Sequence, residues 1–92
     1  MELTRTAIAG TLESSDIMIT LSPGGGRVEI ELASTVEKEF GEAIRQEIAA
    51  VLSAEGVANA KVTAVDKGAL DCTIRARVKT AVSRACGEVT EA

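Results

Sequence analysis

The sequence of 92 residues predicts a small α+β domain in which an antiparallel sheet packs on one long helix. Two observations predict this class. Two pairs of segments alternate apolar and polar residues with the period of a β-strand, and the segment between the pairs repeats its apolar residues at helical spacing. Because this length supports only one small core, we expect a single domain over residues 1–92, with a frayed tail at about 87–92.

The first pair of predicted strands flanks a segment rich in turn-forming residues. Residues 3–9 are compatible with an additional edge strand, and residues 17–21 and 28–32 alternate clearly. The segment 22–26 between the latter two reads Ser-Pro-Gly-Gly-Gly, so we expect a β-hairpin. A glycine-rich phosphate loop is the alternative, but that loop leads into a helix, whereas Arg27 opens a strand.

Residues 35–55 are predicted to form the long helix. Ser34 followed by Glu37 has the form of a capping box, and Gly56 suits a left-handed C-terminal cap. The apolar residues that return to one face are Val36, Phe40, Ile44, Ile48, Val51 and Leu52. The opposite face is mainly acidic and carries Glu37, Glu39, Glu42, Glu47 and Glu55. We interpret this face as solvated, with docking onto a basic partner as the alternative.

A second pair of alternating segments follows the helix. Residues 60–65 and 70–78 flank an Asp-Lys-Gly turn at 66–68, which predicts a second hairpin. The spacing of the later apolar residues changes to that of a helix, which predicts a short C-terminal helix at about 79–87.

Composition excludes several classes of function. The net charge is −4 and the chain has one aromatic residue, which argues against nucleic-acid binding. It has no histidine, so we expect no catalytic residue, no metal site and no enzyme that acts alone. Cys72 and Cys86 are isolated thiols, which favours a reducing cytoplasm. No segment has the pattern of an export signal or a membrane span, so we expect no membrane partner.

The polar segment 10–16 reads Gly-Thr-Leu-Glu-Ser-Ser-Asp. Serine and aspartate favour turns, so an ordinary turn is the simplest interpretation. The sequence offers no base to activate a serine, so Ser14 or Ser15 would be an acceptor of modification and not a nucleophile. A carrier or a regulated surface is therefore the functional alternative.

Three blocks of the sequence resemble the citrate lyase acyl carrier protein family, the gamma subunit. Residues 10–18 resemble the segment to which the family attaches its prosthetic group. Residues 39–44 resemble its central helix, and residues 65–78 resemble its C-terminal hairpin almost throughout. The resemblance extends from about residue 7 to residue 82 in the expected order.

The resemblance implies that Ser14 carries a phosphoribosyl-dephospho-coenzyme A arm through a phosphodiester, with Glu13, Ser15 and Asp16 flanking it. A related carrier, that of malonate decarboxylase, has Gly-Ser-Gly-Asp at this place. The comparison favours Ser14 over Ser15, and citrate lyase over malonate decarboxylase. Because Glu13 and Asp16 are acidic, we expect them to repel the phosphates of the arm and keep it off the carrier surface.

The same resemblance implies that the protein is a phosphoprotein of citrate fermentation, a carrier subunit and not an enzyme by itself. The thiol of the arm would hold acetyl and citryl thioesters. The alpha subunit of the lyase would exchange acetyl for citrate, and the beta subunit would release oxaloacetate. A prosthetic-group transferase would attach the arm. The alternatives are the carrier subunit of malonate decarboxylase and a non-carrier α+β interaction module, whose activity Ser14→Ala would leave intact.

Overall fold

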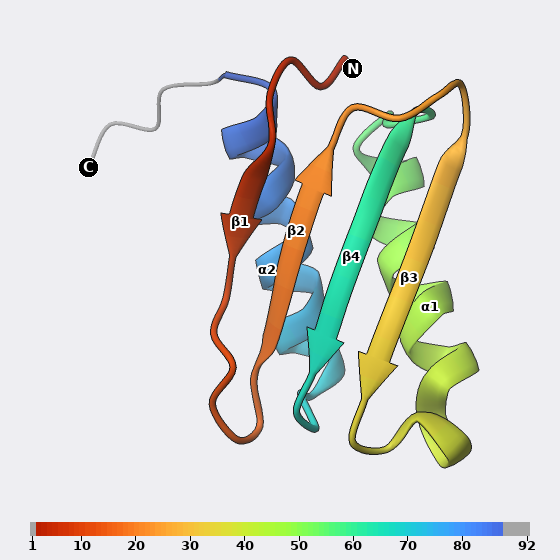
Figure 1. Cartoon of the computed structure of the whole chain (residues 1–92), viewed down its shortest axis with the longest axis vertical. Coiled ribbons are helices and arrows are strands. Elements are labelled where there is room, and N and C mark those ends of the chain that lie inside the picture. The colour runs from red at the N-terminus through yellow and green to blue at the C-terminus, as the bar shows by residue number, and fades with distance from the viewer. Residues whose placement is uncertain (1, 88–92) are drawn as a thin grey trace.

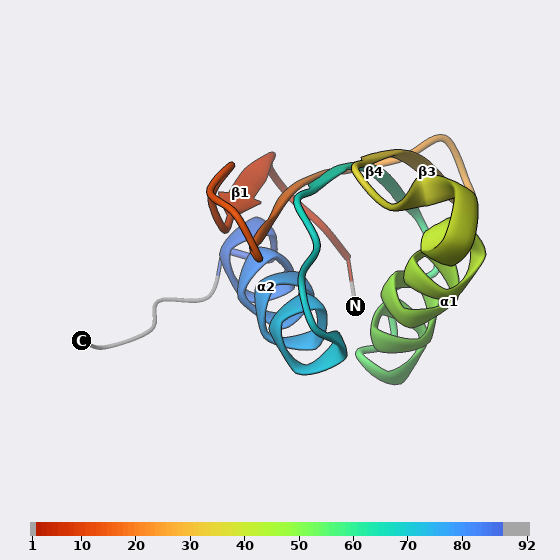
Figure 2. The same cartoon turned by 90° about the horizontal axis from the view of Figure 1, so that it is seen from below.

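The computed structural model describes residues 2–87, so the expected frayed tail, apart from Gly87, lies outside the described residues. Within them, the order of elements is β1 (Ala7–Ala9), β2 (Ile17–Ser22), β3 (Val28–Ser34), α1 (Glu37–Ala54), β4 (Ala60–Asp66) and α2 (Asp71–Ala85). Both helices cover the same face of the sheet (Figure 1 and Figure 2). The predicted α+β class is confirmed, with the long helix packed on the sheet.

The strand order across the sheet is β1-β2-β4-β3. β1 pairs antiparallel with β2, which confirms the expected edge strand near the N-terminus. β4 lies between β2 and β3, antiparallel to the first and parallel to the second. The sheet is therefore mixed, not antiparallel throughout.

The predicted first hairpin is wrong, because β2 and β3 are separated by β4. After β3 the chain crosses over through α1 and returns as β4, the connection that parallel strands need. The glycine-rich segment passes over the start of β4 instead of closing a tight turn. The N–H of Gly26 donates to Asn59 Oδ1 at 2.7 Å, and the N–H of Ala60 donates to Arg27 O at 3.1 Å.

The predicted second hairpin is also wrong, because most of residues 70–78 belong to α2. The short C-terminal helix exists, but it begins at Asp71 and not near 79. Apolar residues at 70, 74 and 78 satisfy both a period of two and a helical spacing of four, so the alternation alone did not separate the two structures. In the structure Ile74 and Val78 are buried, while Cys72 is exposed.

The two ends of α1 differ in how well they were predicted. The left-handed cap is confirmed: Gly56 has φ +74°, and the N–H of Val57 donates to Leu52 O at 2.8 Å. The capping box is wrong, because no side chain caps the first turn of α1. Ser34 Oγ instead accepts a hydrogen bond from the N–H of Val36 and donates to a carboxylate of β4, Asp66.

The core lies between the sheet and the two helices and is aliphatic. The largest fully buried apolar side chains are Ile17, Ile19, Leu21, Ile48, Leu52, Ile74, Val62, Val78 and Val82. Phe40, which the helical pattern places on the buried face, is 57% exposed. The first turns of α1 extend past the strand ends, where the sheet no longer covers them (Figure 1). Neither helix within residues 2–87 is long and apolar enough to cross a membrane.

Candidate functional site

Residues 10–16 form the loop between β1 and β2, at the end of the sheet where β4 also ends (Figure 1). The two ends of this loop meet at Gly10, which has φ +95°. A Cβ atom at Gly10 would lie 1.8 Å from the carbonyl oxygen of Ile17, so only glycine fits there. The loop is therefore closed tightly at its base.

Ser14 and Ser15 are the central residues of a turn at the tip of this loop. The turn is closed by the N–H of Asp16, which donates to Glu13 O at 3.1 Å. Ser15 has φ +66° and is the one residue other than glycine with a positive φ in the described part of the chain. A β-turn with positive φ at its third residue usually places glycine there. The turn therefore holds Ser15 in a conformation that serine does not favour.

The turn is attached to the loop that joins β4 to α2. The N–H of Ser15 donates to Lys67 O at 2.8 Å, and the N–H of Lys67 donates to Asp16 O at 2.8 Å. Through these two hydrogen bonds Lys67 faces both Ser15 and Asp16 directly beyond the last β2–β4 pair, Ile17 with Asp66, in the two-against-one arrangement of a β-bulge. The turn with the two serines is thus fixed to the sheet and is not a freely moving loop.

Asp66 holds the other side of this junction. Asp66 is 1% exposed, and its carboxylate accepts hydrogen bonds from Ser34 Oγ at 2.8 Å, from the N–H of Gly68 at 3.1 Å and from the N–H of Ala69 at 3.0 Å. A buried carboxylate requires such partners. Asp66 therefore fixes the backbone around Lys67, the residue whose N–H and C=O are hydrogen-bonded to the turn.

The carboxylate of Asp16 makes most of the side-chain hydrogen bonds that hold the loop 10–16 in place. Oδ2 accepts from the N–H of Thr11 at 3.1 Å and from Thr11 Oγ1 at 2.6 Å, while Oδ1 accepts from the N–H of Ile17 at 2.7 Å. Arg77 of α2 donates from Nε to Oδ1 at 3.0 Å and from Nη2 to Oδ2 at 2.9 Å. The carboxylate thus joins both ends of the loop to the helix.

These donors stabilise the ionised form of Asp16. The hydrogen bonds from Arg77, and then that from Thr11, hold the pKa of the Asp16 carboxyl well below its ordinary range, although burial acts in the opposite direction. The hydrogen bond to Asp16 in turn raises the pKa of the Arg77 guanidinium. Asp16 is 8% exposed, and its carboxylate is bonded to Arg77 and to the backbone of the loop itself.

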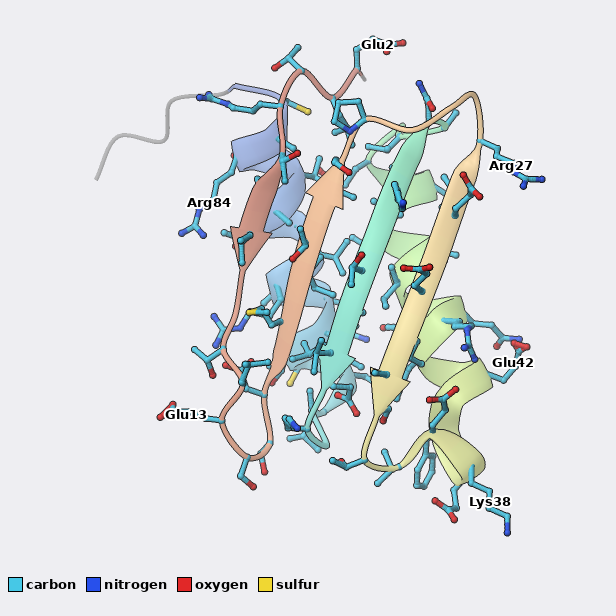
Figure 3. The ribbon with its side chains drawn as sticks, in the orientation of Figure 1. Glu2, Glu13, Arg27, Lys38, Glu42 and Arg84 are labelled. Atoms are coloured by element: carbon cyan, nitrogen blue, oxygen red, sulfur yellow. The ribbon has the colours of Figure 1, made fainter. Side chains whose placement is uncertain are left out.

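The structure brings the four predicted site residues together in one turn, with different roles. Ser14 and Ser15 are exposed, and within residues 2–87 neither hydroxyl makes a hydrogen bond. Glu13 is exposed and points away from the sheet (Figure 3). A free primary hydroxyl on a fixed turn, hydrogen-bonded to no base, is suited to accept a group that a partner enzyme delivers and is not itself activated as a nucleophile.

Two residues of the site were missed at the level of sequence, Thr11 and Arg77. Arg77 lies 61 residues from Asp16 along the chain, and the second predicted hairpin placed it on a strand. Only the true start of α2 brings its side chain to the loop. No group of three or more residues among those described could hold a metal ion, and Cys72 and Cys86 form no disulfide.

Comparison with known proteins finds a family model that matches most of the chain and relatives that match nearly all of it. Residues 4–85 match the family model described as malonate decarboxylase delta subunit (MdcD). The citrate lyase acyl carrier protein of Latilactobacillus sakei subsp. sakei (strain 23K) is 58% identical over 88 residues, covering 96% of this chain and 87% of that protein. That of Lacticaseibacillus casei (strain BL23) is 57% identical over 90 residues, covering 98% and 89%.

A solved structure shares the fold. A chain in the crystal structure of a Pseudomonas malonate decarboxylase hetero-tetramer in complex with malonate superposes with a TM-score of 0.74. The match covers 92% of both chains at 17% identity, which supports the architecture alone. The high identity to carriers from several organisms decides the family, and on that ground this chain belongs to the citrate lyase acyl carrier protein family.

Proposed function

We propose that this chain is the acyl carrier subunit of a citrate lyase and that Ser14 carries a phosphoribosyl-dephospho-coenzyme A arm through a phosphodiester. The observation that carries the proposal is the Ser14 hydroxyl, which is exposed and lies on a turn fixed to the sheet, in a chain of this family. We further propose that residues 1–92 act as one carrier domain in the cytoplasm.

Ser14 is a better attachment point than Ser15. The backbone of Ser15 is bonded to Lys67 and has the positive φ that the turn requires, so this position serves the geometry of the turn. The related malonate decarboxylase carrier has glycine at this position, the residue that such a backbone favours. Ser14 precedes it with a φ that is not positive, so the cost of a left-handed backbone does not fall on Ser14.

Attachment at Ser14 needs a donor that carries the arm as a phosphoanhydride. The Oγ–H bond of Ser14 and the P–O bond to the phosphate leaving group break, and a bond between Oγ and phosphorus forms. The hydroxyl proton passes to a base of the transferase, because no carboxylate of the turn is hydrogen-bonded to the Ser14 hydroxyl and that of Asp16 is occupied by Thr11, Ile17 and Arg77. The product is a phosphodiester, in agreement with the proposed linkage.

Once attached, the arm supplies the thiol that carries the acyl group. The chain contributes a fixed attachment point, and tethering raises the effective concentration of that thiol at partner active sites within its reach. Exposed Glu13, next to Ser14, carries the negative charge that opposes contact of the arm's phosphates with the turn. The proposed partners are the alpha and beta subunits of the lyase and the transferase, with acid-base chemistry residing on the partners.

The test is citrate cleavage by a lyase reconstituted from alpha and beta subunits with variants of this chain prepared in cells that contain the transferase. Ser14→Ala should reduce cleavage to the level without carrier, because no hydroxyl accepts the arm. Ser15→Ala is the matched control and should retain cleavage close to that of the wild-type chain. Cleavage at the wild-type rate with Ser14→Ala would contradict the proposal and favour an interaction module without an arm.

The carrier subunit of malonate decarboxylase is the second candidate, because the matching family model has that description. The same chain can be tested with the decarboxylase subunits and malonate. Restoration of malonate decarboxylation, with none of citrate cleavage, would favour this second candidate.

A further inference from the structure

We propose that Arg77 is a positioning residue for the modification of Ser14, and that through Asp16 it determines which of the two adjacent serines receives the group. This inference rests on the proposed function, because it concerns the same loop. It assigns a role to a side chain on α2 that lies outside the Glu-Ser-Ser-Asp segment.

Arg77 is held in a geometry suited to fixing a carboxylate. Two nitrogens of its guanidinium contact different oxygens of Asp16, at 3.0 and 2.9 Å, which restrains both the position and the orientation of the carboxylate. The helix that carries Arg77 is packed into the core through Ile74, Val78 and Val82. The two hydrogen bonds between Arg77 and Asp16 therefore hold the loop 10–16 to the rigid helix α2.

Asp16 passes this restraint to both ends of the loop. Its Oδ2 is shared by Arg77 and by the N–H and Oγ1 of Thr11, and its Oδ1 is shared by Arg77 and the N–H of Ile17. Thr11 Oγ1 also accepts from the N–H of Glu13 at 3.2 Å, so the network reaches the residue before Ser14. Loss of the guanidinium would leave the carboxylate bonded only within the loop, so that residues 11–13 are no longer held to α2 and are loosened.

Loosening of the loop would change the site because of the backbone conformation of Ser15. A residue other than glycine keeps a positive φ only where its surroundings enforce it. If the loop is loosened, Ser15 can return to a negative φ, and the directions of the two neighbouring hydroxyls change. Modification at Ser14 would then slow, and modification at Ser15 would become competitive.

Arg75 is the matched control on the same helix. It is two residues before Arg77, is similarly exposed and forms an ion pair, but its partner is Glu47 of α1 and not a residue of the loop. Arg75→Gln and Arg77→Gln therefore remove the same charge from the same helix and each break one ion pair. Only the second breaks the contact with Asp16.

The experiment uses the unmodified full chain, the prosthetic-group transferase and its phosphoanhydride donor, with the product followed by intact mass and peptide mapping. Arg77→Gln should lower kcat/KM for the carrier by about 10- to 100-fold and increase the share of product at Ser15. Arg75→Gln should stay within about twofold of wild type and modify Ser14 alone, as most surface changes have small effects. Arg77→Lys, which keeps a charged donor, should recover part of the rate.

Amide hydrogen exchange separates this role from a general loss of stability. In Arg77→Gln, exchange should accelerate in residues 11–16 relative to the core strands. If this variant does not fold, Asp16→Asn is the substitute, since it weakens the same contact from the other side. A wild-type rate and selectivity in Arg77→Gln, or an equal loss in Arg75→Gln, would overturn the proposal. Absence of any modification of the wild-type chain would overturn both this inference and the proposed function.

Discussion

Ser15 has φ +66°, a backbone conformation that residues with a side chain rarely adopt. The sequence segment Glu-Ser-Ser-Asp predicts a turn. It does not predict which of the two central residues has the positive φ, because both are serine. The structure assigns that conformation to Ser15 through its hydrogen bond to Lys67. The distinction between the two serines is therefore a property of the turn and not of their chemistry.

Ser15→Gly should stabilise the protein by about 1 kcal/mol. Glycine removes the cost of the left-handed backbone, about 1–2 kcal/mol, and this exceeds the extra entropy it adds to the unfolded chain. Urea denaturation measures the change, and the midpoint of thermal unfolding should rise by about 4–8 °C. The control is Ser14→Gly, at the neighbouring position without positive φ, which should destabilise by about 0.5–1 kcal/mol. A destabilised Ser15→Gly would contradict the assigned geometry.

At the scale of elements, the sequence predicts β2, β3, β4 and α1 well and their pairing badly. Alternation shows that a strand has one buried face, but it does not show which strand lies beside it. The choice between a hairpin and a crossover depended on α1 packing over the sheet between β3 and β4. The prediction for residues 70–78 was wrong for a different reason. Their apolar spacing fits both the period of a strand and that of a helix, and only packing against α1 and the sheet favours the helix.

The candidate site was predictable only in part. Ser14 and its three neighbours follow from the resemblance of one contiguous segment, and the structure places all four in a single turn. The inward direction of Asp16 and its pairing with Arg77 depend on the helical conformation of α2, which the sequence pattern did not reveal. Contacts between distant segments were therefore the part of the site that required the structure.

The pairing of the loop with α2 predicts how stability depends on pH. The native pKa of Asp16 lies below its value in the unfolded chain, which is about 3.9. The ionised carboxylate therefore stabilises the fold fully above about pH 4, and this contribution is lost as the pH falls toward the native pKa. Asp16→Asn should be less stable than wild type at pH 7, and the difference should narrow at pH 3.

Urea denaturation at the two pH values measures this narrowing. Arg75→Gln serves as the control, because its partner Glu47 is not part of the loop. A difference between wild type and Asp16→Asn that is equal at pH 7 and pH 3 would mean that the ionised pair with Arg77 does not stabilise the native loop.

On the scale of the whole molecule, the loop that carries Ser14 lies at one end of the sheet (Figure 1). The loop 10–16, the β4–α2 loop and the start of α1 lie at one end, while the N-terminal segment and the end of α2 lie at the other (Figure 1). Any partner that acts on Ser14 must approach the first of these ends. The helix α1, whose first turn lies at the same end, is acidic, and within residues 2–87 its exposed Glu39 and Glu42 form no ion pair, whereas Glu37 and Glu47 do.

Charge reversal at Glu39 and Glu42 therefore tests whether α1 takes part in docking. If it does, the double change to lysine should slow association with the lyase subunits several-fold at low salt and flatten its salt dependence, because steering by complementary charge is screened by ions. The matched control is the reversal of Glu29 and Glu31, exposed on β3. Stopped-flow association rates at several salt concentrations measure the effect. Equal rates for the two double variants and wild type would show that the acidic face of α1 is merely solvated.

The most direct test of the carrier assignment is the intact mass of this chain from cells that cleave citrate, followed by peptide mapping of residues 10–18. We expect one adduct with the mass of the phosphoribosyl-dephospho-coenzyme A arm, located on Ser14, absent from Ser14→Ala and retained in Ser15→Ala. An unmodified chain in cells with an active citrate lyase, or an adduct at another residue, would contradict the assignment of Ser14 as the carrier site.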